Sequence, residues 1–122
     1  MRLNQVTVGA TDYEQSVDFY RRLGLTQIVD SPPFYARFET PHGETLSIHA
    51  ADAVGSGTIV YFEVEDVDGF VAALGLPLDQ PPADRPWLWR EARLRDPAGN
   101  AICIYHAGAN RRFPPWRIGS GA

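Results

Sequence analysis

The chain carries one structural pattern twice, and this internal repeat limits the folds that it can adopt. In both halves a helix pattern that opens at an aspartate ends on the tripeptide Leu-Gly-Leu, at 23–25 and at 74–76. Each half then closes with a glycine-containing turn and a strand of alternating residues, at 40–49 and at 96–106. Because glycine commonly ends helices and alternation is typical of half-buried strands, each half predicts a strand, a helix and three further strands. The predicted fold class is therefore α+β, built from two tandem βαβββ modules.

The boundaries of these elements follow from the same patterns. In the first half we expect a helix over 12–23 and strands over 3–8, 25–30, 34–39 and 45–50. In the second half we expect a helix over 68–74 and strands over 58–64, 76–79, 88–95 and 101–106. Small residues at 50–57 are expected to link the halves, and the proline-rich segment 79–86 is expected to be a loop.

Composition restricts the class of protein further. The 122 residues are enough for one domain with a core, and the net charge of −4 argues against nucleic acid or an anionic membrane surface as partner. No apolar run approaches the roughly 20 residues that a membrane-spanning helix needs. The first ten residues lack the apolar stretch of a signal peptide, and Cys103 is the only cysteine, so no internal disulfide can form. We therefore expect a cytoplasmic protein.

Three motifs bear a resemblance to a known family. They are Gln-Val-Thr-Val-Gly-Ala-Thr-Asp-Tyr-Glu-Gln-Ser-Val-Asp-Phe-Tyr-Arg-Arg-Leu-Gly-Leu at 5–25, Val-Tyr-Phe-Glu-Val-Glu-Asp-Val-Asp-Gly-Phe at 60–70, and Arg-Leu-Arg-Asp-Pro-Ala-Gly-Asn-Ala-Ile-Cys-Ile-Tyr at 93–105. Within the repeat they resemble the vicinal oxygen chelate superfamily, which includes glyoxalase I, extradiol dioxygenases, fosfomycin-resistance enzymes and bleomycin-binding proteins. The resemblance implies a curled mixed sheet around a cavity. It also implies one domain over 1–108, from modules 1–54 and 57–108, with a C-terminal tail over 109–122.

The resemblance also indicates where a metal would be held. The family's ligand positions fall on Gln5, Ser47, Ile59 and Cys103. Glutamine can ligate a divalent metal, but serine is a poor ligand, isoleucine cannot ligate, and a lone thiolate makes a weak site. We therefore expect no cofactor and no tightly held metal. The alternative is a divalent metal bound at a shifted position through His49, two residues beyond Ser47 on the same face.

Strand alternation predicts which side chains share a face with Gln5 and Cys103. Apolar residues of the same strands should pack against the helices. The residues expected to face the cavity are Thr7, Tyr35, Arg37, Ser47, His49, Ile59, Tyr61, Glu63, Glu91, Arg93 and Tyr105. Burying a polar group without a partner costs several kcal/mol. The polar side chains of this face must therefore pair with one another, contact water or bind a ligand.

Two residues of that face are candidates for acid–base catalysis, His49 and Glu91. His49 could instead be hydrogen-bonded locally at a strand end. If His49 met Glu91 and Glu63, the three would form a metal site. Alternatively, the two carboxylates would form ion pairs with Arg37 and Arg93 in a buried network.

The remaining candidates are expected to bind substrate. The arginines offer forked donors to a carboxylate or phosphate, or else lie at a solvated sheet edge. The tyrosines offer flat walls, or else pack in the core. The predicted substrate-binding residues are Tyr35, Arg37, Tyr61, Glu63, Arg93 and Tyr105. Cys103 is expected to be a buried, inert thiol rather than a nucleophile.

Two functions remain open at this point. The first is an enzyme with lyase-, isomerase- or dioxygenase-like chemistry on a small polar or anionic molecule, without the usual metal ligands. The second is a non-catalytic small-molecule-binding protein of the bleomycin-resistance kind. A weaker third is a structural subunit with a vestigial cavity. The resemblance also predicts a homodimer, with Phe113 and Trp116 of the tail suited to a subunit contact.

Overall fold

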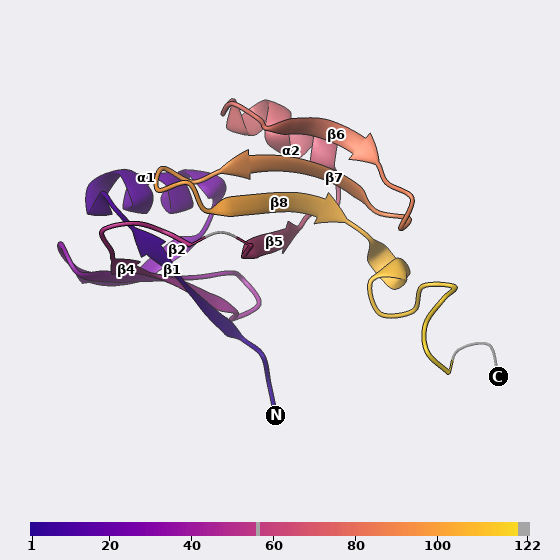
Figure 1. The fold of residues 1–122 in the computed structure, drawn as a ribbon, viewed down its shortest axis with the longest axis horizontal. Coiled ribbons are helices and arrows are strands. Elements are labelled where there is room, and N and C mark those ends of the chain that lie inside the picture. The colour runs from indigo at the N-terminus through magenta and orange to yellow at the C-terminus, as the bar shows by residue number, and fades with distance from the viewer. Residues whose placement is uncertain (56, 120–122) are drawn as a thin grey trace. The chain divides into compact units, whose positions relative to one another are not determined.

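The elements follow the predicted order in both halves of the chain (Figure 1). The computed structural model describes residues 1–55 and 57–119, so Ser56 of the expected link and residues 120–122 of the expected tail lie outside the described residues. The first half contains β1 (Gln5–Ala10), α1 (Tyr13–Leu23), β2 (Thr26–Ser31), β3 (Tyr35–Glu39) and β4 (Thr45–Ala50). The second contains β5 (Ile59–Glu63), α2 (Val67–Leu74), β6 (Gln80–Asp84), β7 (Arg90–Arg95) and β8 (Ala101–His106), followed by the short 3₁₀ helix η1 (Gly108–Asn110).

The strands form two four-stranded mixed sheets with the same internal order. In the first the order is β1-β4-β3-β2, and in the second it is β5-β8-β7-β6. The first strand of each module runs parallel to the last, and the other pairs described are antiparallel. The sheets are curled but not closed. The predicted α+β class with two βαβββ modules is confirmed.

The chain divides into two compact units. The first consists of Met1–Thr58 and Arg95–Asn100, and the second of Ile59–Leu94 with the chain from Ala101 onward. The turn between β7 and β8 thus belongs to the first unit. None of the helices in the described part of the chain is long and apolar enough to span a membrane.

Both helices begin and end through the same local chemistry. Asp12 and Asp66 precede α1 and α2, and each carboxylate accepts a 3.0 Å hydrogen bond from a backbone N–H of the first turn. Such caps satisfy N–H groups that have no partner inside the helix. Gly24 and Gly75 end the helices with φ of 111° and 65°, a left-handed conformation that glycine adopts without steric cost.

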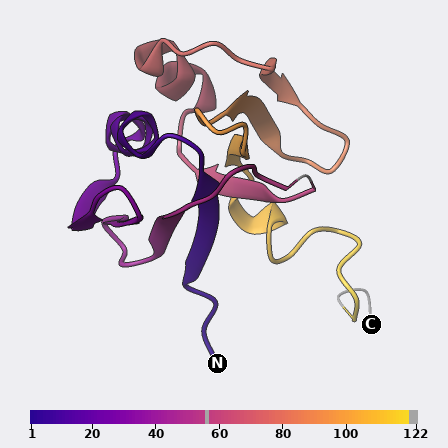
Figure 2. The ribbon, with the colours of Figure 1, turned by 60° about the vertical axis from the view of Figure 1, so that its left-hand side comes forward.

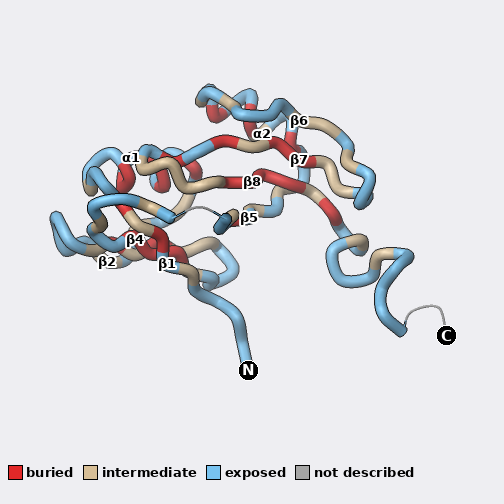
Figure 3. The backbone as a smooth tube through the Cα atoms, viewed as in Figure 1, coloured by how far each residue is buried: buried red, intermediate tan, exposed pale blue. Residues whose placement is uncertain are grey.

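In each unit the helix covers the apolar face of its sheet. In the first unit Tyr20 of α1 is fully buried, and its ring centroid lies 5.7 Å from that of Phe38 on β3. Figure 2 shows α1 end-on beside this sheet. In the second unit β8 is almost entirely buried (Figure 3). The residues expected on the helix-facing rows are all buried: Ala36, Phe38, Leu46, Ile48, Ala92, Leu94, Ile102 and Ile104.

One strand differs from the sequence prediction. A strand was expected over 76–79 and a loop over 79–86, but β6 occupies Gln80–Asp84 within that loop. Its pairing with β7 is irregular between Gln80 and Ala83, where Pro81 and Pro82 stand. Proline cannot donate to a ladder but is tolerated at a sheet edge, and β6 is an edge strand. Position in the sheet therefore overrides the local proline signal.

Candidate ligand-binding faces

The first sheet presents a row of polar side chains on the face opposite the helix. In the register of β1, β4 and β3, Ser47 lies between Thr7 and Arg37. The hydroxyl oxygens of Thr7 and Ser47 are 2.6 Å apart. Tyr35 pairs with His49 in the next row of the same parity. These five residues were predicted to lie on one face of the sheet, and the observed register agrees with that prediction.

Tyr35 and Arg37 contact each other on this face. Nε of Arg37 donates a 2.9 Å hydrogen bond to the hydroxyl of Tyr35, and its guanidinium carbon lies 5.4 Å from the ring centroid. A hydrogen bond from the Ser47 side chain and the guanidinium of Arg37 together lower the pKa of Tyr35, against a smaller opposing effect of burial. Both residues are half-buried, so their polar ends remain accessible.

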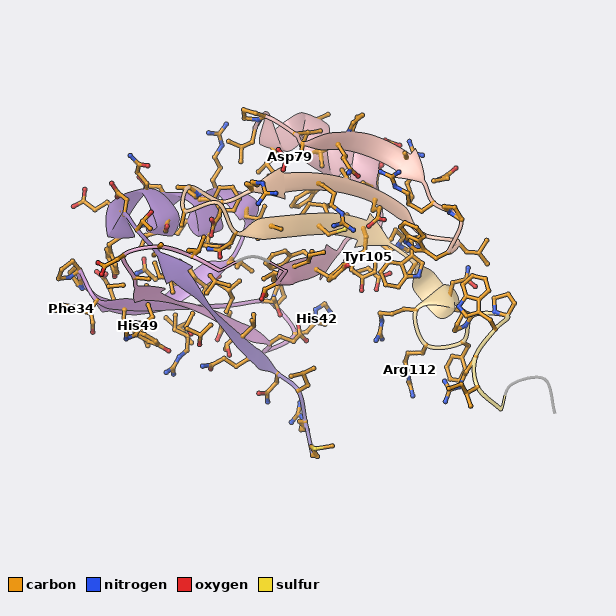
Figure 4. All side chains as sticks on the ribbon, in the orientation of Figure 1. Phe34, His42, His49, Asp79, Tyr105 and Arg112 are labelled. Carbon is orange, nitrogen blue, oxygen red and sulfur yellow. The ribbon has the colours of Figure 1, made fainter. Side chains whose placement is uncertain are left out.

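His49 is exposed, and its Nδ1 lies 3.0 Å from the carbonyl oxygen of Ala50. Figure 4 shows it on the side of the sheet away from α1. This local bond is the arrangement anticipated as the alternative to a catalytic role. His49 belongs to the first unit, whereas Glu63 and Glu91 belong to the second, where each has partners of its own.

Glu91 is the main buried charge of the second sheet, with 1% of its surface exposed. The thiol of Cys103 donates to it at 2.9 Å, Nη2 of Arg93 lies at 3.4 Å, and Nε of Arg85 lies at 3.7 Å. The predicted ion pair between Glu91 and Arg93 is thus present. Sequence reasoning missed Arg85, because it was assigned to a loop. The hairpin that carries it is closed by backbone hydrogen bonds between Arg85 and Trp89 and between Arg85 and Leu88.

Cys103 is fully buried beside Glu91. Burial and the adjacent carboxylate raise the pKa of the thiol to about 12. The thiol therefore stays protonated near neutral pH and cannot act as a thiolate nucleophile. The predicted burial of the thiol is confirmed, and its inertness stays a prediction.

Three aromatic rings form a cluster on the same face as Glu91. Trp89 stacks on Tyr105 with centroids 4.7 Å apart, and Tyr61 meets Tyr105 edge-on at 5.6 Å. Tyr105 is buried (labelled in Figure 4), whereas Tyr61 is 44% exposed. Tyr105 therefore packs as a core residue, and Tyr61 and Trp89 carry the accessible ring surface.

The carboxylate of Glu63 binds the backbone of the segment that follows β8. Its Oε2 accepts hydrogen bonds from the backbone N–H groups of Ala107 and Gly108, at 2.8 and 3.0 Å, where η1 begins. Burial disfavours its charge, but these two N–H groups, together with the positive charges of His106 and Arg111, outweigh that effect and lower the pKa of Glu63. Nδ1 of His106, the last residue of β8, lies 2.9 Å from the carbonyl oxygen of Val64.

One hydrogen-bond donor of Arg93 lacks an acceptor in the described part of the chain. Its Nε is buried without a hydrogen-bond partner among the described residues. Its Nη2 donates to Glu91 at 3.4 Å, and its guanidinium carbon lies 6.0 Å from the ring centroid of Tyr61. An unpaired buried N–H costs about 1–3 kcal/mol. The observed arrangement of Arg93 therefore leaves hydrogen-bonding capacity for an additional acceptor.

Comparison with known proteins decides the family. The model of the Glyoxalase/Bleomycin resistance protein/Dioxygenase superfamily matches residues 2–104. The chain belongs to this superfamily. It is also 35% identical over 127 residues to "Uncharacterized protein YraH" of Bacillus subtilis (strain 168), an alignment that covers 86% of this chain and 98% of that protein. The resemblance drawn from the sequence motifs is confirmed.

Solved structures of the glyoxalase/bleomycin resistance/dioxygenase superfamily have the same fold. A lactoylglutathione lyase from Agrobacterium tumefaciens is similar with a TM-score of 0.72 at 21% identity, covering 86% of this chain and 92% of that one. A bleomycin resistance determinant encoded on the transposon Tn5 is similar with a TM-score of 0.72 at 15% identity, covering 87% and 98%. At these identities the likeness concerns the fold alone.

The positions that would hold a divalent metal in this superfamily do not fit one here. Gln5 accepts a 2.9 Å hydrogen bond from Thr45, and Cys103 keeps its proton beside Glu91. Ser47 is a neutral hydroxyl, and Ile59 has no donor atom. Across residues 1–55 and 57–119 no three His, Cys, Asp or Glu side chains form a group that could hold a metal. The donor set therefore disagrees with the superfamily's usual site.

Proposed function

We propose that the protein binds a small anionic molecule carrying a flat ring on the polar face of the second sheet. The observation that carries this proposal is Arg93, which has unused hydrogen-bonding capacity beside the accessible rings of Tyr61 and Trp89. A ligand carboxylate or phosphate would accept from Arg93 while its ring packs on the aromatic surface.

The local charge favours an anion. The guanidiniums of Arg85 and Arg93 approach the single carboxylate of Glu91, which leaves one excess positive charge in a chain whose net charge is −4. Their side chains are 28% and 25% exposed, so part of each guanidinium can reach a ligand. Hydrogen bonds from guanidinium to carboxylate or phosphate are charge-assisted and often bidentate. Arginine pairs of this kind therefore discriminate anions from neutral analogues.

The rings supply the second part of the recognition. Trp89 is held in place by its stacking on the buried Tyr105 and by a 3.5 Å contact from its Nε1 to the carbonyl of Asn110. A ring fixed in this way loses little entropy when a ligand packs against it. Aromatic pairs contribute about 0.5–1.5 kcal/mol beyond the area that they bury. A planar ligand is therefore preferred to a saturated one of the same charge.

Binding without turnover has more support than catalysis by His49 or Glu91. The imidazole of His49 is exposed and bonded to its neighbour's carbonyl, and Glu91 is enclosed by two arginines and a thiol. Enzyme chemistry of the superfamily remains the alternative, and its proton-transfer group would need to reach the ligand.

We also propose a homodimer, because Phe113 and Trp116 are more than half exposed on the C-terminal segment.

Calorimetric titration of the full chain with benzoate tests the proposal. We expect benzoate to bind more tightly than cyclohexanecarboxylate, which lacks the flat ring, and than benzamide, which lacks the charge. Arg93→Gln should weaken benzoate binding at least tenfold, and Trp89→Leu should remove the preference for the aromatic acid. Arg21→Gln, an exposed arginine of α1, is the matched control and should change nothing. Equal affinities for benzoate and benzamide, or an unaffected Arg93→Gln variant, would overturn the proposal.

A further inference from the structure

The hairpin between β6 and β7 holds one residue in a strained backbone conformation. The backbone N–H of Arg85 donates to the carbonyl of Trp89 at 2.8 Å, and that of Leu88 donates to the carbonyl of Arg85 at 2.9 Å, so the loop is three residues long. Leu88, the last of the three, has a φ of 69°. Three-residue hairpin loops usually place glycine at this left-handed position, because a Cβ is disfavoured there. Leucine therefore costs conformational free energy that glycine would avoid.

The side chain of Leu88 gives the folded unit little packing in return for this cost. It is 49% exposed, and the neighbouring Trp87 is exposed as well. Strained backbone conformations that persist in proteins are concentrated at functional positions. The tip of the hairpin therefore presents apolar surface that the packing of the second unit does not explain.

Residues 107–119, which we call the C-terminal segment, extend this surface. Nε1 of Trp89 at the base of the hairpin lies 3.5 Å from the carbonyl oxygen of Asn110 in η1. Figure 1 shows the β6–β7 connection and η1 at the same end of the second sheet. Phe113 and Trp116 of the segment are exposed. The apolar end of the second unit therefore consists of four exposed side chains, Trp87, Leu88, Phe113 and Trp116.

Contacts within the C-terminal segment hold its side chains together. The guanidinium carbons of Arg112 and Arg117 lie 5.2 and 4.5 Å from the ring centroid of Phe113. Nη1 of Arg117 also donates to the carbonyl of Arg112 at 2.6 Å, and its backbone N–H donates to the carbonyl of Pro114 at 3.0 Å. A segment that is already ordered loses less entropy when a partner docks on it. The aromatic ring and two positive charges are thus presented as one group.

The charge of the C-terminal segment indicates what covers the apolar end. The segment contains Arg111, Arg112 and Arg117 and no acidic residue, so it carries +3 in a chain whose net charge is −4, and the remaining residues carry −7. Two such segments repel each other, which disfavours a contact of the segment with itself. The acidic remainder of a second copy complements it, and a two-fold arrangement makes that contact twice.

We propose that the apolar end of the second unit docks on an acidic surface of a second copy of this chain. The proposed contact rests on the homodimer proposed above and identifies the surface that forms it. Trp87, Leu88 and the aromatic rings of the C-terminal segment supply the buried apolar area, and the arginines pair with carboxylates of the partner copy. Leu88 is retained in its strained conformation because its side chain is used in this contact.

Sedimentation velocity of the full chain tests the contact. We expect a dimer whose Kd increases when NaCl is raised to about 0.5 M, because salt screens exposed charges. Leu88→Gly and Arg112→Gln should each raise the Kd about tenfold, as for truncation of a central interface residue. Leu3→Gly, which removes an exposed leucine of the first unit, and Arg21→Gln are the matched controls and should leave the Kd unchanged.

The possible failures of this experiment are distinguishable. A chain that stays monomeric at all concentrations would overturn both the proposed contact and the homodimer. A dimer that Leu88→Gly and Arg112→Gln leave intact, or that salt strengthens, would overturn the contact and leave the homodimer standing. Neither result affects the proposed binding of benzoate, which the Arg93→Gln variant tests separately.

Urea unfolding of the monomer tests whether the strain at Leu88 serves the contact. At dilutions where the chain is monomeric, Leu88→Gly should unfold at the same or a higher urea concentration than wild type, because glycine adopts the left-handed conformation freely. Leu88→Asn should behave similarly, since asparagine also tolerates this region of φ. If both variants unfold at clearly lower urea concentrations, Leu88 stabilises the fold itself and its proposed role in docking is wrong.

Discussion

The hydroxyl of Tyr20 donates a 2.6 Å hydrogen bond to Oδ2 of Asp96, 76 residues further along the chain. Both residues are buried. Asp96 also accepts from the backbone N–H groups of Ala98 and Asn100, and the Asn100 amide donates to the carbonyl of Gly9 at 2.8 Å. The Asp-Pro-Ala-Gly-Asn turn is therefore more than a tight connection between two strands. It joins the second half of the sequence to the core of the first unit.

Tyr20→Phe should lower the free energy of unfolding by about 1–3 kcal/mol, because it leaves a buried carboxylate oxygen with one partner fewer. Urea unfolding followed by circular dichroism measures the change. Tyr13→Phe is the matched control, since Tyr13 also donates to an aspartate, Asp30, but in an exposed setting. It should cost less than Tyr20→Phe. Equal losses in the two variants would show that burial of the Tyr20–Asp96 bond is unimportant.

Lowering the pH should remove the stabilisation that Glu63 provides. Its pKa is lowered in the folded chain, so the folded state favours the carboxylate, and the contribution is present above the unfolded pKa of about 4.3. This stabilisation is lost as the pH falls through the pKa that Glu63 has in the folded state. Glu63→Gln should therefore be about 1 kcal/mol less stable than wild type at pH 7, as for the loss of a helix cap.

Unfolding free energies measured from pH 7 down to the acid limit test this expectation. The difference between wild type and Glu63→Gln should shrink as the carboxylate of the wild type becomes protonated. Glu65→Gln, two residues away and exposed, serves as the control and should show no such convergence. A difference that stays constant with pH would mean that the charge of Glu63 is not what caps the N–H groups of Ala107 and Gly108.

Cys103 should resist thiol reagents in the folded protein. The raised pKa of about 12 keeps it protonated at pH 8, and its burial excludes the reagent. Iodoacetamide labelling followed by mass spectrometry should be at least a hundredfold slower than in urea. Stability should also fall as the pH rises above roughly 8.5, because the unfolded thiol ionises there while the folded one does not. Cys103→Ser should not show this decline. Rapid labelling under native conditions would contradict the buried position.

The sequence indicated local features more reliably than contacts between distant segments. The opening of each helix at an aspartate and its stop at Gly24 or Gly75 depend only on neighbouring residues, and both were anticipated, although α2 begins at Val67 rather than at 68. Face assignments also followed from alternation, which is a local property. The strand β6 was missed because proline normally signals a loop, and only the edge position in the sheet explains why it is tolerated.

The candidate sites show the same limit. Alternation placed Glu91 and Arg93 on one face, and their ion pair follows. Arg85 comes from the irregular end of a hairpin, so no periodic pattern indicated that it approaches Glu91. The capping role of Glu63 was also missed, because it depends on where the chain turns after β8. The roles of His49 and Glu91 in catalysis stay predictions, since they depend on a ligand.

Glu91→Gln should tighten the binding of benzoate. The substitution keeps the shape of the side chain but removes the negative charge beside Arg85 and Arg93. The local excess of positive charge then rises from one to two, which favours an anionic ligand by Coulomb attraction. We expect a several-fold lower Kd by calorimetry, with no gain for benzamide. Loss of benzoate binding would instead indicate that Glu91 contacts the ligand, as its predicted catalytic role requires.

Removal of divalent metal should leave benzoate binding unchanged. The superfamily's ligand positions here include the carbon side chain of Ile59 and the protonated thiol of Cys103, which cannot complete a coordination sphere. Plasma mass spectrometry of the purified chain should find metal well below one equivalent, and treatment with EDTA should not alter the Kd. His49→Ala provides the critical comparison, because His49 is the residue through which a shifted site was considered. A stoichiometric metal that is lost in this variant would establish such a site and require a metal-dependent mechanism.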